Sequence, residues 1–326
     1  MIDYFTNKTI LITGSQGYLG TQIKSALASA SCRIVAFDRK LPENSSDTGK
    51  AEIRYVQGDV QDPAIWDQLL DGVDIIFHLA AQTSSRAANE NPLMDLQANV
   101  VPVLNLITAC HRNNRFPDIL FAGTATQVGL TESYPVNESW KDEPITIYDI
   151  HKLTVEQHLR FYAKNKGRAV TLRLANLYGP GPKSSNADRG ILNWMVRQAI
   201  DQQPLMVYGD GSFVRDYIFV DDVVRAFLLA AVHMDQTTKQ YFVLGTGEGH
   251  TFLEMVTCIQ ETVKRLLGYK VQVQTVPPPE NLSPIEFRRF VADSSAFQNA
   301  TGWKADVSLK EGIERTVEYF IKETAQ

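Results

Sequence analysis

Short, continuously apolar segments alternate with segments of helical periodicity through the first half of this 326-residue chain, and this alternation constrains the fold most strongly. Strands that read as unbroken hydrophobic runs between helices indicate a parallel sheet covered on both faces. The sequence therefore predicts an α/β fold, a doubly wound parallel sheet of the Rossmann type. Strands are expected at 8–13, 33–38, 51–59, 73–80, 118–123 and 169–176, and helices at 19–30, 62–72, 92–113 and after Tyr148.

The second half of the chain has a less regular pattern of expected strands, helices and loops. A segment rich in Gly, Pro and Ser at 177–190 predicts a long loop. Two β-rich runs in 204–220, joined around Asp210-Gly211, predict a β-hairpin. The segment 274–284, with three consecutive prolines, is expected to be a stiff connector, and 241–249 is expected to return a strand to the first sheet.

Two later helices are predicted from capping boxes, in which a Ser or Thr and a Glu three residues later satisfy free amide groups. These boxes are Thr251 with Glu254 and Ser308 with Glu311. Together, the segments predict a sheet domain and a smaller, mixed C-terminal lobe. The expected bounds are 1–176, with a returning segment near 218–246, for the sheet domain, and 177–217 and 247–326 for the lobe.

Composition narrows the possible partners. Apolar residues make up 44% of the chain, charged residues 21%, and the formal net charge is −5. That balance gives no electrostatic reason to bind nucleic acid or an anionic membrane. No apolar run reaches the roughly 20 residues of a membrane span, and no export signal is visible. Cys32, Cys110 and Cys258 are expected to be buried free thiols of a cytoplasmic protein, and the six histidines lack metal-ligand spacing, so no metal is expected.

A glycine-rich turn follows the first expected strand. Gly14, Gly17 and Gly20 are spaced three apart between that strand and the next helix. Such glycines allow a tight turn and close approach of the backbone to a pyrophosphate, and the helix N-terminus adds oriented amides. This spacing alone is a weak signal. Asp38 ends the next strand, however, where a carboxylate can bind both ribose hydroxyls of NAD and would repel the 2′-phosphate of NADP. The sequence therefore predicts a dinucleotide site that favours NAD, with Arg39 adjacent.

Seven motifs follow one another in register along the chain. They are "TGSQGYLG", "FD", "GDV" at 58–60, "HLAAQ" at 78–82, "YDIHK" at 148–152, "LRLANLYGPG" at 172–181 and "RDYIFVDDV" at 215–223. Together they resemble the extended short-chain dehydrogenase/reductase family, and within it the nucleotide-sugar epimerases and dehydratases. The resemblance runs nearly from end to end of the chain.

The resemblance implies a set of NAD-binding residues. The pyrophosphate would be wrapped by Gly14, Gln16, Gly17, Tyr18, Leu19 and Gly20. The adenosine would be held by Asp38 and Arg39 at the ribose and by Asp59 and Val60 beside the adenine. The nicotinamide ribose would lie above Leu79, Ala80, Ala81 and Gln82.

Three of the residues to which the resemblance gives a role have simpler explanations too. Asp59 could cap a turn instead of touching adenine. His78 is expected to be a hydrogen-bonded core histidine. Asn99 occupies a helix position that is close to the active site in the family, but it also precedes Pro102, which should kink the helix.

Tyr148 and Lys152 are four positions apart, so both emerge on one face of the helix. Without a cofactor site, the pair would be an ordinary aromatic–cation contact. Beside NAD, the lysine ammonium and the positive nicotinamide would lower the tyrosine pKa, and Lys152 would also bind the nicotinamide ribose. Tyr148 could then take a proton from a sugar hydroxyl while the same carbon loses a hydride.

The resemblance implies that Thr124, just after a strand, is the third catalytic group and binds the substrate hydroxyl, with Thr126 as a weaker candidate. Family dehydratases carry Asp-Glu directly after the threonine, where this chain has Ala125-Thr126. Family uronate decarboxylases carry a Glu in the same stretch, and it too is absent. Neither of these two activities is expected.

The smaller lobe is expected to bind the diphosphate of a nucleoside-diphosphate sugar. Asn176 ends a strand at the ligand-binding edge of the sheet. Arg215 resembles the family arginine that pairs with the diphosphate, although it could instead form a local ion pair with Asp216. Arg288 or Arg289 could reach the same group, or both could lie on a solvated face. Gly245, Gly247 and Gly249 are explained by the start of a helix and are left out of the site.

These features favour an NAD-dependent nucleotide-sugar 4-epimerase that works through a transient 4-keto sugar. The alternatives are an NAD(P)-dependent 4-ketoreductase or dehydrogenase with net redox turnover, and a non-catalytic dinucleotide sensor. The resemblance also implies a homodimer, formed through the helix of Tyr148 and Lys152 and the helix near Asn99.

Overall fold

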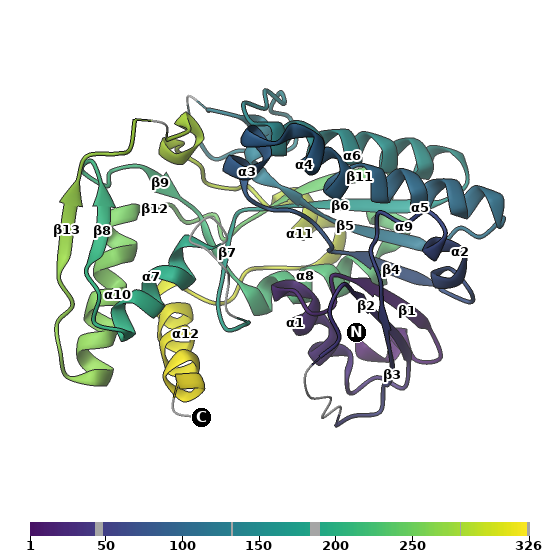
Figure 1. The fold of residues 1–326 in the computed structure, drawn as a ribbon, viewed down its shortest axis with the longest axis horizontal. Coiled ribbons are helices and arrows are strands. Elements are labelled where there is room, and N and C mark those ends of the chain that lie inside the picture. Colours follow the sequence, from purple (N-terminus) through teal and green to yellow (C-terminus); the bar gives the residue numbers. More distant parts are fainter. Residues whose placement is uncertain (43–47, 132, 183–189, 281, 325–326) are drawn as a thin grey trace.

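A seven-stranded sheet, in which every neighbouring pair of strands is parallel, forms the centre of the protein (Figure 1). The computed structural model describes residues 1–42, 48–131, 133–182, 190–280 and 282–324. Within them, the strand order of this sheet is β3-β2-β1-β4-β5-β6-β11. This is the doubly wound order, with one further strand at the edge, so the predicted Rossmann-type fold is confirmed. The strands are β1 (Thr9–Thr13), β2 (Arg33–Asp38), β3 (Glu52–Gln57), β4 (Ile75–His78), β5 (Asp118–Thr124), β6 (Arg168–Leu174) and β11 (Gln240–Leu244).

Helices cover both faces of this sheet, which is why its strands read as unbroken apolar runs. Ile10 and Ile12 of β1 are buried against one layer of helices, while Leu11 between them is buried against the other. The first layer contains α1 (Tyr18–Leu27) and α8 (Val220–Val232), and the second contains α2 (Ile65–Leu69), α5 (Val101–Arg112) and α6 (Ile147–Asn165).

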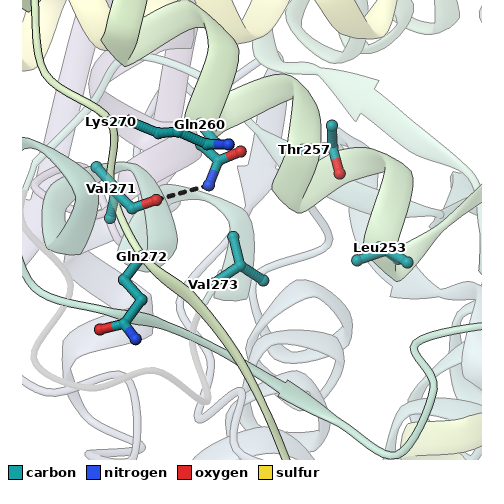
Figure 2. A pocket seen from close by; sticks show the side chains of 7 residues that line it. All are labelled: Leu253, Thr257, Gln260, Lys270, Val271, Gln272 and Val273. Atoms are coloured by element: carbon teal, nitrogen blue, oxygen red, sulfur yellow. Dashed lines mark hydrogen bonds between the residues drawn. The ribbon is translucent and has the colours of Figure 1, made fainter.

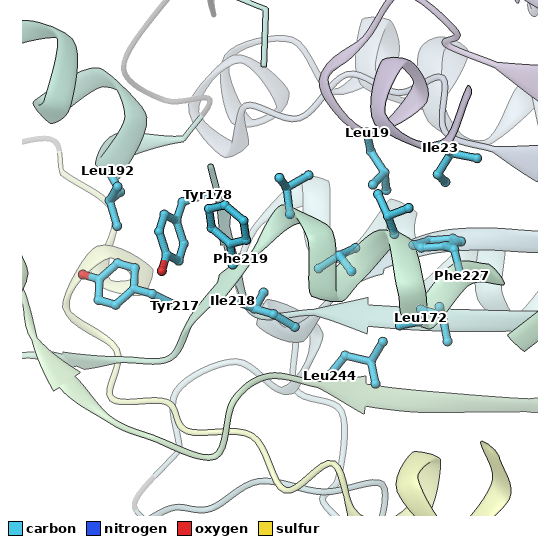
Figure 3. Close-up of a cluster of buried hydrophobic side chains, with 14 of the residues drawn as sticks. Leu19, Ile23, Leu172, Tyr178, Leu192, Tyr217, Ile218, Phe219, Phe227 and Leu244 are labelled. Carbon is cyan, nitrogen blue, oxygen red and sulfur yellow. The ribbon is translucent and has the colours of Figure 1, made fainter. Parts of the chain in front are cut away.

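The core on the α1 and α8 face continues into the smaller lobe (Figure 3). The strands β7 (Asn176–Tyr178) and β10 (Tyr217–Phe219) pair in parallel outside the main sheet. Their side chains Tyr178 and Phe219 lie in the same buried cluster as Leu19 of α1. The two parts of the protein therefore share one hydrophobic core.

The smaller lobe is built around three helices that pack on one another, and it adds two short pairs of strands. The helices are α7 (Ile191–Ile200), α10 (Phe252–Leu267) and α12 (Leu309–Thr324). The strand pairs are β8 (Leu205–Tyr208) with β13 (Val273–Val276), which is parallel, and β9 (Val214–Arg215) with β12 (His250–Thr251), which is antiparallel. The remaining described elements are η1 (Ile2–Phe5), η2 (Ala125–Val128), η3 (Pro284–Phe287), α3 (Ser85–Glu90), α4 (Pro92–Asn99), α9 (Met234–Thr237) and α11 (Ser295–Thr301).

The hairpin predicted in 204–220 is wrong. The chain does turn at Gly209 and Gly211, both of which have positive φ, but the strands on either side of the turn pair elsewhere. β8 pairs with β13, which overlaps the start of the segment 274–284 expected to be a connector, and β9 pairs with β12. The reason is tertiary: Phe213 packs against Phe252, which draws the run after the turn toward α10 instead of back onto β8.

The capping boxes differ in completeness. Thr251 and Glu254 exchange both hydrogen bonds at the start of α10, as predicted. At the start of α12, the Glu311 amide donates to the Ser308 hydroxyl at 3.3 Å.

The predicted long helix at 92–113 is divided in two. α4 ends at Asn99 and α5 begins at Val101, with Pro102 in its first turn. This confirms the expected break, because proline cannot donate the helical hydrogen bond. Within the described residues, the stretch Pro92–Arg112 is long and apolar enough to cross a membrane by length and composition alone, contrary to expectation. In this fold it is a core layer, in which Val103 and Leu106 are buried against α6.

Candidate active site

The glycine turn between β1 and α1 is too tight for side chains. Gly14 has a φ of +69°, and a Cβ there would lie 2.8 Å from the backbone nitrogen of Ala80. A Cβ at Gly20 would lie 2.2 Å from the carbonyl oxygen of Gly14, and one at Gly17 would lie 3.0 Å from it. No side chain caps the N-terminus of α1. The turn therefore offers bare backbone at a helix N-terminus, which suits a pyrophosphate.

Asp38 lies directly against this turn. Its carboxylate accepts the Gln16 amide at 3.0 Å and the Lys40 amide at 3.2 Å. Gln16, expected at the pyrophosphate, thus has its backbone N–H directed to Asp38. Arg39 is exposed beside it. A half-buried carboxylate at the end of β2 is a suitable partner for ribose hydroxyls.

The side chains after the glycine turn point away from it. Leu19 is buried in the core (Figure 3), and the ring of Tyr18 packs on Gly181, where a Cβ would lie 2.2 Å from it. Only the backbone of these two residues can therefore approach a pyrophosphate.

At the end of β3, Asp59 makes the turn-capping contact considered from the sequence. It accepts the Gln61 amide at 2.9 Å. Val60 is buried, and its carbonyl accepts a hydrogen bond from the Trp66 indole at 3.0 Å. Both residues follow a strand that neighbours β2, so they lie at the same edge of the sheet as Asp38.

His78 is a core residue, as expected. The Thr13 hydroxyl lies 3.0 Å from His78 Nδ1 and accepts the amides of Leu79 and Ala80, each at 3.2 Å. Since that hydroxyl must then donate to the imidazole, Nδ1 is unprotonated. Burial lowers the His78 pKa to about 3. The neutral ring holds the backbone at 79–80 against β1, beside the glycine turn.

Asn99 clamps the "HLAAQ" segment. Its amide accepts the Gln82 N–H at 3.0 Å and donates to the Gln82 carbonyl at 3.0 Å. Ala81 lies within the segment that this clamp holds. Asn99 therefore has a fixed structural contact as well as its place at the end of α4.

Two residues in this cluster were not anticipated. Asp95 is fully buried and accepts hydrogen bonds from Gln82 at 2.6 Å and from Asn99 at 2.9 Å. Its other oxygen lies 2.6 Å from His151 Nδ1. The available signal was an Asp four residues before Asn99, on the same face of a short helix. The link to His151 joins residues 56 positions apart, and the sequence did not reveal it.

Lys152 is buried on α6, and its ammonium reaches β5. It donates to the Ala122 carbonyl at 2.9 Å and lies 4.5 Å from the centre of the Phe121 ring and 5.8 Å from that of Tyr148. Burial lowers the Lys152 pKa to about 8, while Asp95 acts in the opposite direction. One of its three donors is used by Ala122, so others can serve a ligand.

The protein residues alone do not give the lowered Tyr148 pKa that is expected beside bound NAD. Burial, and then the charges of Asp149 and Asp95, raise the Tyr148 pKa above its ordinary value. Burial is the largest of these causes, and the Lys152 ammonium lies toward β5, 5.8 Å from the centre of the Tyr148 ring. The phenol is therefore protonated at neutral pH unless a further positive charge stands beside it.

Thr124 ends β5 and caps η2, and both candidate threonines belong to one hydrogen-bonded chain. The hydroxyls of Thr124 and Thr126 lie 2.7 Å apart. The Thr126 hydroxyl also forms a hydrogen bond with Asp149, which is fully buried and accepts the Thr146 hydroxyl at 2.7 Å. Asp149 follows Tyr148 directly, and its contact with Thr126, 23 positions earlier, leaves no signal in the sequence.

On the substrate side, Arg288 and Asn176 meet directly. Arg288 donates to the Asn176 amide oxygen at 3.1 Å and to the Ile285 carbonyl at 3.0 Å. Arg289 is exposed, whereas Arg288 is half-buried. The structure thus separates the two arginines that the sequence left equivalent. Burial and the charge of Arg215 lower the Arg288 pKa.

Arg215 is buried at 4% exposure and donates to the backbone carbonyl and the carboxylate of Glu286, at 2.5 and 3.3 Å. Within the described residues, its Nε is buried without a hydrogen-bond partner. Two neighbouring guanidinium groups and an unpaired donor favour an anion at this place.

Arg215 does not pair with Asp216, the local alternative considered from the sequence. The buried Asp216 carboxylate instead accepts the amides of Thr246 at 2.8 Å, Gly247 at 3.0 Å and Ala292 at 3.1 Å. The glycine-rich turn at 245–249 is therefore occupied from within the chain.

A separate surface depression of about 510 Å³ lies between α10 and the chain leading into β13 (Figure 2). Gln260 crosses it and donates to the Val271 carbonyl at 2.6 Å, while Lys270 is its one charged lining residue. None of the predicted site residues lines this depression.

Comparison with known proteins places these features in a family. Residues 10–245 match the family described as the NAD dependent epimerase/dehydratase family. The chain is 28% identical to UDP-glucose 4-epimerase of Mycolicibacterium smegmatis, across 95% of this chain and 97% of that protein. It is 26% identical to UDP-glucuronic acid decarboxylase 1 of Danio rerio, across 97% of this chain and 73% of that protein. The structure of UDP-glucose 4-epimerase from Thermotoga maritima with UDP-glucose superposes with a TM-score of 0.86 at 27% identity, covering 97% and 99% of the two chains.

Proposed function

This chain belongs to the NAD dependent epimerase/dehydratase family, and on that basis we propose that it is an NAD-dependent nucleotide-sugar 4-epimerase. It would invert C4 of a nucleoside-diphosphate hexose through a transient 4-keto sugar. The observation that carries this proposal is that Tyr148 and Lys152 share one helix face, while Lys152 reaches β5 two residues before Thr124.

The residues at the sheet edge fit NAD. The bare glycine turn would hold the pyrophosphate, Asp38 the adenosine ribose, and the free donors of Lys152 the nicotinamide ribose. The chemistry supplied by NAD, when bound, is reversible acceptance of a hydride from the sugar carbon. Its positive ring would also provide the charge that Tyr148 needs in order to ionise.

The protein residues would handle the proton and the position of the sugar. Tyr148 takes the proton of the C4 hydroxyl and later returns it. Thr124 holds the C4 oxygen, and Lys152 holds the charge beside Tyr148. The 4-keto sugar then turns within the site before it is reduced on its other face.

The substrate class follows from the two guanidinium groups. Arg215 and Arg288, with Asn176, would bind the diphosphate. The Thermotoga maritima neighbour was solved with UDP-glucose, so UDP-glucose is the first substrate to test. The base and the sugar substituents are left open by this proposal.

The test is incubation of purified protein with UDP-, dTDP-, CDP- and GDP-hexoses, followed by NMR of the sugar. We expect a C4 isomer of at least one substrate without added reductant. Absence of any C4 or C2 isomer with all of them would overturn the proposal. Release of carbon dioxide from UDP-glucuronic acid would instead indicate decarboxylation, despite the missing Glu.

A second candidate is a 4-ketoreductase with net redox turnover. The observation in its favour is the raised pKa of Tyr148, because a protonated phenol is the acid that reduction of a ketone requires. This candidate predicts stoichiometric consumption of NADH or NADPH with a 4-keto sugar. An epimerase consumes neither.

We also propose a homodimer formed through the helix pair α4–α5 and α6. Leu93 is 64% exposed and Phe161 is 67% exposed, and Leu96 and Ile150 are exposed on the same two helices, α4 and α6. Apolar side chains exposed in this number suggest a buried interface. Sedimentation equilibrium tests this, and a Phe161→Glu variant should shift the protein toward monomer.

A further inference from the structure

The hydroxyls of Thr146 and Thr126 meet at the buried carboxylate of Asp149, and the hydroxyl of Thr124 lies one hydrogen bond further along. Thr146 donates its hydroxyl to Asp149 Oδ2 at 2.7 Å and accepts the Asp149 amide at 3.2 Å. Thr126 contacts the other carboxylate oxygen through its hydroxyl. Thr124 follows, 2.7 Å from the Thr126 hydroxyl, and it accepts the Thr126 amide at 3.3 Å.

Counting protons gives this chain two possible directions. Each threonine hydroxyl carries one proton, and an ionised carboxylate can only accept. With Asp149 ionised, Thr126 donates to Asp149 and Thr124 donates to Thr126, so Thr124 presents only a lone pair to the substrate. With Asp149 protonated on Oδ1, every bond reverses, and the Thr124 proton points outward.

The two directions have opposite effects on a sugar oxygen. Tyr148 must take the proton of the C4 hydroxyl, so that proton cannot also be donated to Thr124. Only an outward Thr124 proton can bind the C4 oxygen while Tyr148 removes its proton, and the same donor stabilises the 4-keto oxygen. When Thr124 donates to Thr126 instead, a lone pair of the Thr124 oxygen faces a lone pair of the C4 oxygen.

We propose that Asp149 is a positioning residue that sets the direction of the Thr126–Thr124 chain, and that its protonated form turns the Thr124 hydroxyl toward the substrate. This rests on the proposed function, because it assigns a partner to Thr124 in the same reaction. It also gives Thr126 a role, as the link between Asp149 and Thr124.

The surroundings of Asp149 agree with this assignment. Burial raises its pKa, and the charge of Glu286 acts in the same direction, while the hydroxyl hydrogen bonds and Arg288 lower it. Tyr148 adjoins it on α6, and Asp95 on α4 and Lys152 on α6 are the other charged groups around that tyrosine. Arg288 is also a proposed diphosphate ligand, so binding of the substrate would offset the positive charge of Arg288, which favours ionised Asp149.

Asp149→Asn is the informative variant, because an amide copies the protonated acid. If the Thr146 hydroxyl donates to the side-chain oxygen of the new residue as it does to Asp149 Oδ2 in the wild type, the NH₂ group of the new side chain lies on the Thr126 side and donates to it. We expect kcat within about threefold of the wild-type value at low pH, and loss of the decline in kcat that ionisation of Asp149 causes in the wild type. Thr126→Val should lower kcat at least about tenfold with KM nearly unchanged. In this variant the Thr124 hydroxyl is no longer oriented toward the C4 oxygen. Thr126→Ser should restore kcat.

Two outcomes would overturn the proposal: an Asp149→Asn profile identical to that of the wild type across pH, or a folded Asp149→Asn protein with no activity at any pH. Asp235→Asn is the matched control, because Asp235 forms an exposed ion pair with Arg168 at the opposite edge of the sheet. Its pH profile should be that of the wild type.

Infrared difference spectra of wild type minus Asp149→Asn separate this proposal from the proposed function, since they require no turnover. We expect the carbonyl band of a protonated carboxylic acid, titrating with pH and shifting in Thr126→Val. If this band is present but no nucleotide sugar is epimerised, the proposed function fails while the state of Asp149 stands. If the enzyme is active only where the band is absent, the positioning role of protonated Asp149 is wrong.

Discussion

The side-chain amide of Asn99 pairs with both backbone groups of Gln82, each at 3.0 Å, and so links α4 to the segment after β4 in the manner of one strand pairing with another. Asn99→Ala would leave a buried N–H and a buried carbonyl without partners. We expect its free energy of unfolding to fall by about 2 kcal/mol, measured by urea denaturation. Its affinity for NAD should fall too, because Gln82 is no longer held.

The control for that variant is Asn105→Ala on the following helix. The side chain of Asn105 donates to the Gln61 carbonyl at 3.1 Å and is half-buried. We expect a loss below about 1 kcal/mol and unchanged NAD affinity. Equal losses from the two variants would remove the special role given to Asn99.

Tyr148→Phe removes the proposed base while keeping the ring. We expect kcat to fall by about 10² to 10⁴-fold, with NAD affinity nearly unchanged, measured by NMR turnover and fluorescence titration. Tyr319→Phe is the control, since Tyr319 is 40% exposed on α12. Normal turnover by Tyr148→Phe would show that another group moves the proton.

The affinity for NAD should depend on pH through Lys152. Its pKa is lowered to about 8 by burial, so the ammonium predominates below that pH and the neutral amine above it. We expect NAD affinity to weaken by up to about tenfold as pH rises through 8, because a charge-assisted hydrogen bond becomes a neutral one. Asp95 raises this pKa, so Asp95→Asn should move the transition to lower pH. A transition that does not move would point to a different group.

Acid should destabilise the fold through His78. Its pKa is about 3 in the folded protein and about 6.5 in an unfolded chain. The unfolded state therefore binds more protons between these values, and stability falls as pH drops below 6.5. Between pH 7 and 4.5 the contribution is on the order of 2 kcal/mol, measurable by urea denaturation. His78→Leu should lack this part of the pH dependence, whatever its stability at pH 7.

The two neighbouring arginines provide a matched pair for the substrate site. Arg288 contacts Asn176, and Arg289 is exposed. We expect Arg288→Ala to raise KM for the nucleotide sugar by about 10 to 100-fold through loss of a charged hydrogen bond, whereas Arg289→Ala changes KM little. Steady-state kinetics at fixed pH checks this, and the reverse ranking would move the diphosphate site.

The sequence predicted the sheet well because its signals are local. Alternating apolar strands, the glycine turn, and the break between Asn99 and Val101 each depend on residues close together in the chain. The hairpin at 204–220 failed for the opposite reason. Its turn residues were read correctly, but the partner of each strand was decided by contacts far along the chain, such as Phe213 with Phe252.

The same division applies to the site. Tyr148 with Lys152 is a helical spacing and can be read directly. Asp149, by contrast, gains its meaning from Thr126, which lies 23 positions away on another element. Asp95 and His151 likewise meet across two helices. Side chains that connect different elements in this way follow no helical or strand spacing, so a single sequence does not reveal their contacts.

The carboxylate of Asp216 has a consequence for how the smaller lobe is built. It receives the amides of Thr246 and Ala292, which lie 30 and 76 positions further along the chain. Glycine-rich turns in other proteins bind a phosphate from solution, and the shape of such a turn then depends on whether the phosphate is bound. Here the chain supplies its own acceptor, the Asp216 carboxyl group, so the turn is filled from within. The Asp216 side chain thus links three stretches of the chain that are far apart in the sequence. This link does not depend on the concentration of nucleotide or phosphate around the protein.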